Sequence, residues 1–141
     1  MRAIGLDVGE RRIGVSAGDT ESHIAVPVGA VDRAVVDDEI GQILAMAAER
    51  DAEAIVVGLP LSMNGRMGAQ AEVTQEFIDA LAARTAIAIA TVDERLTSVE
   101  AERRIRESTP AGRRGKRRAP SKGAIDAGAA VLILQAWLDA R

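Results

Sequence analysis

Residues 2–18, RAIGLDVGERRIGVSAG, contain two apolar runs, 2–8 and 12–18, separated by a glycine and two charged residues. Two such runs joined by a tight turn predict the antiparallel strands of a β-hairpin. A third apolar run, 24–31 (IAVPVGAV), follows closely. Pro27 has no amide hydrogen to donate, so we expect this strand at a sheet edge or at a β-bulge. The chain is therefore predicted to start with an antiparallel sheet.

The hydrophobic pattern then changes to a helical period. Apolar side chains at 40, 43, 44 and 47 predict an amphipathic helix over 35–50. Beyond it, short apolar runs predict buried strands and amphipathic stretches predict helices. The expected elements are strands at 53–59 and 86–92, helices at about 69–84 (buried face Val73, Phe77 and Leu81), 98–106 and 122–140, and loops at 60–68 and 107–123.

The resulting order, β-β-β-α-β-α-β-α-α, combines an antiparallel start with strand–helix–strand crossovers. Such crossovers place helices on the faces of a sheet. We therefore predict a single α/β domain over residues 1–141, with a mixed five-stranded sheet and helices on both faces. A chain of 141 residues that is 48% hydrophobic is typical of a protein with one buried core.

Composition excludes several classes of protein. The chain has no cysteine, which rules out a disulfide scaffold and thiolate metal sites. An aspartate at position 7 interrupts the first apolar run too early for a signal peptide. No run approaches the roughly 18 apolar residues of a membrane span. We expect a soluble, cytoplasmic protein that does not bind membranes.

Charge is distributed unevenly along the chain. Residues 1–100 carry 8 basic and 17 acidic side chains, whereas residues 101–141 carry 10 basic and 4 acidic ones. This asymmetry favours contact with a polyanion through one region, although a solvated loop would have the same composition. Phe77 and Trp137, the only aromatic residues, have the helical spacing of core residues. Without aromatic side chains to stack on bases, the protein would hold nucleic acid through phosphates and shape. The basic candidates are Arg113, Arg114, Lys116, Arg117 and Arg118.

Carboxylates stand at three informative positions. Asp7 ends an apolar strand, where an aspartate is costly unless it is paired or binds a metal, although it could also stabilise the turn. Asp93 and Glu94 follow another strand, and alternation allows only one of them to face the same side as Asp7. Asp126 lies among small residues that allow its helix to approach the sheet, although it could simply complement the helix dipole.

Three carboxylates without cysteine suit a hard cation, Mg²⁺ or Mn²⁺, and do not suit zinc. The lone histidine, His23, is read as a surface residue. Such a cluster can hold two ions about 3.5–4 Å apart that activate water and stabilise the leaving oxygen of a phosphodiester. The sequence therefore indicates a metal-dependent nuclease.

Four blocks of the chain resemble, in order and spacing, those of the YqgF/RuvX family. They are GLDVGERRIGV, VGLPLSMNGRMGAQAEVTQEF, VDERLTSVEAE and KGAIDAGAAVLILQAWL. The family is described as RNase H-like nucleases that process the 5′ end of precursor small-subunit (16S) rRNA, and Holliday junction resolvase activity has also been attributed to it. The resemblance spans nearly the whole chain.

The resemblance implies roles for individual residues. It identifies Asp7, Glu94 and Asp126 as the catalytic, metal-binding carboxylates, and so favours Glu94 over Asp93. It also implies that the turn after the first strand and the 60–68 loop, including Ser62, border the substrate. With these positions, the nucleic-acid-binding candidates outside the basic run are Arg11, Arg12, Asn64, Arg95 and Lys122.

Three other functions remain open at this stage. The first hairpin resembles the phosphate-binding hairpin of actin-like ATPases and sugar kinases, which need a second domain to enclose ATP. A ribosome-assembly module could bind RNA without cutting it. A Holliday junction resolvase makes two symmetric cuts in branched DNA and so needs a homodimer, and no feature of the sequence reports a dimer interface.

Overall fold

A computed structural model describes residues 1–62, 64–96 and 122–141 of the chain. It contains one five-stranded sheet in the order β3-β2-β1-β4-β5. The first three strands pair antiparallel, whereas β4 and β5 are parallel to β1. The mixed sheet expected from the sequence is confirmed. Its strands are β1 (Arg2–Val8), β2 (Arg12–Asp19), β3 (Ile24–Asp32), β4 (Ala54–Leu59) and β5 (Ala88–Asp93).

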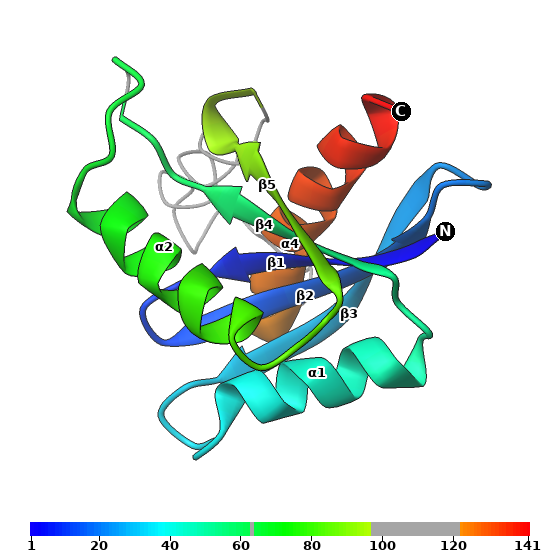
Figure 1. The fold of residues 1–141 in the computed structure, drawn as a ribbon, viewed down its shortest axis with the longest axis horizontal. Helices are drawn as coiled ribbons and strands as arrows, with labels where there is room; N and C mark the ends of the chain where they lie inside the picture. The colour runs from blue at the N-terminus through cyan, green and yellow to red at the C-terminus, as the bar shows by residue number, and fades with distance from the viewer. Residues whose placement is uncertain (63, 97–121) are drawn as a thin grey trace, which may run out of the picture.

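Helices cover both faces of the sheet, as predicted (Figure 1). The helices α1 (Glu39–Glu49) and α2 (Ala69–Ala82) lie on one face, and α4 (Lys122–Asp139) lies on the other. Each face has its own apolar cluster, and both predicted core aromatics are buried, Phe77 beneath α2 and Trp137 beneath α4. No helix within the described ranges has both the length and the apolar composition that a membrane span requires.

The central strand β1 is buried on both faces, from Ala3 to Val8. Ile4, Leu6 and Val8 belong to the cluster under α1 and α2, and Ala3 to the cluster under α4. Because side chains alternate along a strand, Gly5 and Asp7 share the α4 face with Ala3. The residues that β1 directs toward α4 are thus small ones, followed by a single carboxylate.

The edge strand β3 confirms the expectation for Pro27. Within the described part of the chain, strand β3 pairs only with β2. Its register shifts where Pro27 and Gly29 lie opposite Ser16 and Val15, which leaves one residue of β3 in a bulge. Near the start of the strand, the Gln135 side chain accepts a hydrogen bond from the Ala25 amide. It also donates one to the His23 carbonyl. Helix α4 therefore binds backbone groups of this edge that a further strand would otherwise use.

Two predictions about the helices need correction. Helix α1 begins at Glu39 rather than near 35 because the Asp38 side chain caps it, accepting a hydrogen bond from the Gly41 amide at 3.1 Å. Val73 was expected on the buried face of α2 and is 48% exposed. Steps of four residues drift by about 40° each around a helix, so Val73 lies far from the stripe that packs on the sheet. That stripe is Ala71, Thr74, Phe77, Ile78 and Leu81.

Candidate active site

Asp7 lies at the carboxyl end of β1, and only 6% of it is exposed. It is opposite Gly14 of β2, and its other neighbouring strand is β4, where Leu6 pairs with Val57. The next residue of β4 beside Asp7 is Gly58, since the two strands run parallel. The strand positions on either side of this carboxylate are therefore glycines, which have no side chain above the sheet.

Glu94 is the second buried carboxylate at this edge, with 8% of it exposed. It opens a short 3₁₀ helix, η1 (Glu94–Leu96), directly after β5. A Cβ added to Gly58 would lie 2.9 Å from Glu94 Oε1 and would also meet Ile133 of α4. The Glu94 carboxylate thus extends over Gly58 on the α4 face, which is the face that Asp7 shares.

Asp93, the alternative to Glu94, is bound to Arg95. The Asp93 carboxylate accepts hydrogen bonds from Arg95 Nε at 3.0–3.1 Å and from Arg95 Nη2 at 2.6 Å. These hydrogen bonds from the Arg95 side chain lower the pKa of Asp93 below its usual value. The Asp93 carboxylate is thereby committed to a guanidinium, and the geometry favours Glu94 as the partner of Asp7.

Helix α4 carries the third candidate, Asp126. The hydroxyl of Ser16, which is fully buried, donates a hydrogen bond to the Ala130 carbonyl at 2.8 Å. Near Ala130 the helix passes over Gly5. Farther toward its C-terminus, near Leu138, it passes over Gly18. Its first turns therefore run toward the carboxyl end of β1. The side chains of residues 122–126, including Lys122, lie outside the described part of the chain.

The described carboxylates suit a hard cation in chemical type. Asp7 and Glu94 offer oxygen ligands from two buried side chains on one face of the sheet. Within the described residues no group of three or more metal-binding side chains is found. The third carboxylate that the sequence predicts, Asp126, has its side chain outside the described part of the chain. Carboxylate oxygens are the ligands that Mg²⁺ and Mn²⁺ prefer, and nucleases use such ions at phosphodiesters.

The turn between β1 and β2 carries two of the basic candidates. The Arg11 side chain is 65% exposed, and the Arg12 side chain is 24% exposed. Asp32 lies 3.8 Å from Arg11 Nε and 3.9 Å from Arg12 Nη2. Both arginines are therefore oriented by the end of β3, beside the strand end that holds Asp7.

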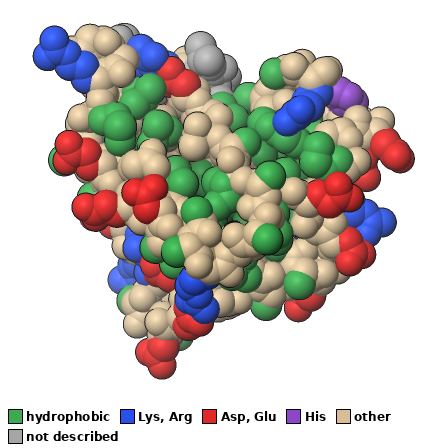
Figure 2. Space-filling model, in the orientation of Figure 1, with side chains coloured by type: hydrophobic (Ala, Val, Ile, Leu, Met, Phe, Trp, Pro, Cys, Tyr) green, Lys and Arg blue, Asp and Glu red, His purple; other side chains and the backbone are tan. Residues whose placement is uncertain are grey.

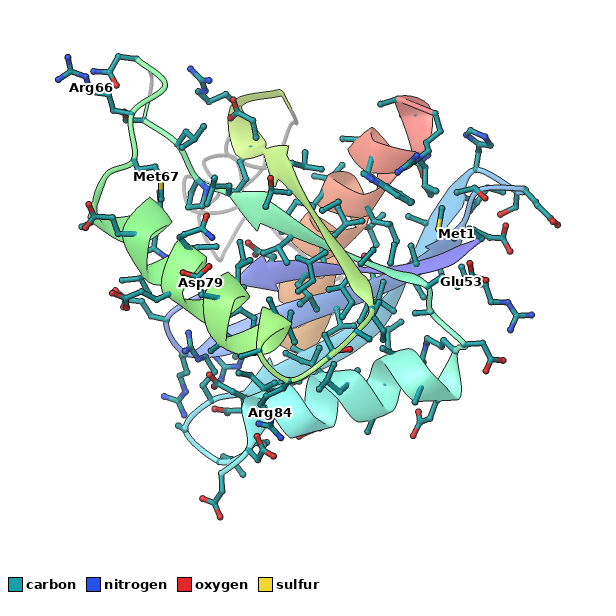
Figure 3. The ribbon with its side chains drawn as sticks, viewed as in Figure 1. Met1, Glu53, Arg66, Met67, Asp79 and Arg84 are labelled. Atoms are coloured by element: carbon teal, nitrogen blue, oxygen red, sulfur yellow. The ribbon has the colours of Figure 1, made fainter. Side chains whose placement is uncertain are left out.

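The loop that follows β4 packs against Arg95. Gly65 adopts a positive φ of 80°, and a Cβ at this position would lie 3.3 Å from Arg95 Nη1. The Asn64 side-chain oxygen accepts hydrogen bonds from the Ser62 hydroxyl and from the Arg66 amide. Asn64 thus shapes the loop from within through its oxygen. Sequence reasoning did not select Arg66, an exposed residue that points away from the body of the molecule (Figure 3).

Acidic side chains dominate the outer surface of α2. Glu72, Glu76 and Asp79 are all exposed along this helix. Across the face formed by α1 and α2, acidic groups are interspersed with single basic ones (Figure 2). Phosphates are repelled from such a surface. The basic run Arg113, Arg114, Lys116, Arg117 and Arg118 lies outside the described residues, as does the short helix predicted at 98–106.

Known proteins resemble the chain over almost its whole length. A family model described as "RuvX: Holliday junction resolvase" matches residues 1–140. A protein of Chloroflexus aggregans, provisionally named a pre-16S rRNA nuclease, is 46% identical over 98% of this chain and 93% of its own length. A relative from Synechococcus elongatus with the same name is 44% identical over 97% of this chain and 88% of its own length.

Solved structures agree on the fold. RuvC of T. thermophilus, in complex with a Holliday junction substrate, aligns with a TM-score of 0.57 at 16% identity and covers 100% of this chain and 95% of that one. The same protein in a second structure aligns with a TM-score of 0.56. The sheet and helices described above thus form the RNase H-like fold that the sequence predicted. Taken with the match over residues 1–140, this places the chain in the RuvX family of nucleases.

Proposed function

We propose that the chain is a divalent-metal-dependent endonuclease that processes the 5′ end of precursor 16S rRNA. The observation that carries this proposal is the pair of buried carboxylates, Asp7 and Glu94, on one face of the sheet at its carboxyl edge. Burying two carboxylates is costly unless a cation or hydrogen-bond donors offset the charge. The curated relatives, which are named for precursor 16S rRNA, support this substrate.

Asp7, Glu94 and Asp126 would together hold Mg²⁺ or Mn²⁺. When bound, these ions lower the pKa of water and neutralise charge that develops on the phosphate. The carboxylates orient the attacking water in line with the scissile bond. Arg11, Arg12 and Arg95 border the site and would contact flanking phosphates.

The two alternatives differ in what they demand of the molecule. A resolvase must cut a four-way junction twice, which requires a dimer with two sites. Its support is the family description and the fold shared with RuvC. An assembly module that only binds RNA would need no divalent metal and would make no cut. Trimming of precursor rRNA needs a single site, and the names of the relatives favour it.

Parallel cleavage assays separate these functions. A labelled 5′ fragment of precursor 16S rRNA and a labelled four-way DNA junction are incubated with the protein in Mg²⁺ and in Mn²⁺, with Asp7→Asn as the control. We expect cuts in the RNA that require metal and are absent in the variant. Paired symmetric cuts in the junction alone would establish the resolvase instead. Tight binding of RNA without any cut would establish the assembly module.

The basic run supplies a second prediction, which rests on the sequence alone. Changing Arg113, Arg114, Arg117 and Arg118 to alanine should weaken RNA binding and flatten its dependence on salt, since each lost phosphate contact removes about 0.7–0.9 from the log–log slope. The slope is measured by fluorescence anisotropy between low and moderate salt. Arg84→Ala, which removes a positive charge paired with Asp38, should leave the slope unchanged. An unaltered slope in the fourfold variant would contradict the phosphate-binding role.

A further inference from the structure

The turn after β1 is tightly constrained. The Gly9 amide donates a hydrogen bond to the Arg12 carbonyl at 2.9 Å. A Cβ on Gly9 would lie 2.7 Å from that same carbonyl oxygen, so position 9 admits only glycine without a shift of the backbone. The turn begins two residues beyond Asp7 and carries Arg11. Its conformation therefore sets the positions of the carboxyl end of β1 and of the neighbouring arginines relative to a bound substrate.

Arg33 binds this turn at two points. Its backbone amide donates a hydrogen bond to the Arg11 carbonyl at 2.7 Å. Its side chain donates a second one, from Nη1 to the Gly9 carbonyl at 2.8 Å. The residue directly follows β3, so the edge strand is linked through Arg33 to the turn beside Asp7.

The Arg33 guanidinium is itself held in place by two helices. Its Nε and Nη2 donate to the two carboxylate oxygens of Glu39, in the first turn of α1, at 2.8 and 3.0 Å. The Arg33 Cζ atom lies 5.8 Å from the ring centre of Phe77 in α2. The side chains of Arg33 and Glu39 are only 24% and 23% exposed. All three guanidinium nitrogens thus have defined partners, which a planar fork can satisfy and an ammonium group cannot.

A second bidentate ion pair at the start of α1 provides a comparison for Arg33. Arg84 binds Asp38, the residue before Glu39, through two hydrogen bonds of 2.6 and 3.0 Å. These contacts lower the pKa of Asp38 to about 2. Both pairs tie the start of α1 to an arginine outside that helix. Arg84 lies just beyond the end of α2 (Figure 3), and within the described residues its side chain donates hydrogen bonds to Asp38 and not to the 9–11 turn.

We propose that Arg33 is a positioning residue for the nuclease site, which holds the 9–11 turn, and with it Asp7, in the geometry that cleavage requires. The proposal rests on the proposed nuclease activity. A bidentate pair with Glu39 would by itself stabilise the fold, as Arg84 with Asp38 does. The additional contacts with the Gly9 carbonyl and the Phe77 ring hold the Arg33 side chain against the turn. Arg33 does not touch the substrate in this proposal.

The test compares Arg33→Met, Arg33→Lys and Arg84→Met with the wild type. Cleavage of the RNA fragment is measured at a temperature where circular dichroism shows every variant folded. We expect kcat to fall about 10- to 100-fold in Arg33→Met, since small errors in position cost this much. Lysine should restore kcat only in part, because one ammonium group cannot satisfy both Glu39 and the Gly9 carbonyl. Arg84→Met should lower the urea midpoint and keep kcat.

Hydrogen exchange at the Gly9 amide gives a readout that does not depend on activity. We expect this amide to exchange at least tenfold faster in Arg33→Met than in Arg84→Met, because the turn opens locally. A normal kcat in Arg33→Met, or equal exchange in the two variants, would overturn the positioning role. If the wild type cleaves no substrate, the proposed function fails, and fast exchange would still establish that Arg33 holds the turn.

Discussion

Replacing Glu94 by glutamine is expected to reduce kcat for RNA cleavage by more than about 100-fold, since even the loss of a residue that only hydrogen-bonds to a metal ligand lowers activity about 10- to 100-fold. Replacing its neighbour Asp93 by asparagine should leave kcat of the same order as in the wild type. The two residues are adjacent in sequence and carry the same charge. They differ in surroundings, because Glu94 extends over Gly58 toward the α4 face and Asp93 is bound by Arg95.

The two variants should also differ in substrate affinity. Asparagine at 93 replaces the carboxylate that binds the Arg95 guanidinium beside the loop at Gly65, and should therefore change KM. Steady-state kinetics of both variants provide the measurement. Equal losses of kcat, or a loss confined to Asp93→Asn, would contradict the assignment of Glu94.

Strand geometry shows why sequence alone left Asp93 and Glu94 open. Strand β5 is apolar on both faces, with Ile89 in the cluster under α2 and Ala90 and Val92 in the cluster under α4. Alternation predicts that neighbouring residues diverge, but it does not say which face meets α4. The structure supplies that answer, and it places Glu94 in line with Ala90 and Val92. The family resemblance had favoured the same residue.

The spacing of hydrophobic residues along the sequence predicted the sheet and the helices on both faces, because packing against a core sets that spacing directly. The contacts around Arg33 had no comparable signal. Its partners Gly9, Glu39 and Phe77 come from three separate segments, and nothing in the local sequence joins them. The role of Asn64 could not be predicted either. An Asn-Gly pair predicts a turn, but it does not show that the Asn64 side-chain oxygen accepts a hydrogen bond from the Arg66 amide of the same loop. Long-range polar contacts are what the sequence did not reveal.

Gly5→Ala is the second change with a large expected effect, because the backbone of α4 lies directly over Gly5. An added Cβ would lie 2.5 Å from the Ser16 hydroxyl oxygen, 2.7 Å from Leu134 Cβ and 3.0 Å from the Ala130 carbonyl oxygen. Carbon atoms in contact normally stand about 3.5–4.0 Å apart. Leu134 Cβ is fixed to the helix backbone and cannot rotate away, so α4 itself must move outward.

We expect Gly5→Ala to lower the free energy of unfolding by about 1–3 kcal/mol, as overpacked cores do. It should also reduce kcat in the folded protein, because α4 carries the proposed metal ligand Asp126 and would move outward from the sheet. Gly128→Ala is the matched control on α4, where an added Cβ has no atom within 4 Å. Alanine is favoured over glycine within a helix, so this variant should gain about 0.5–1 kcal/mol and keep its activity. Urea unfolding and cleavage assays measure both. The same chemical change thus has opposite signs at two positions, and a Gly5→Ala protein as stable as the wild type would show that α4 does not pack this closely on β1.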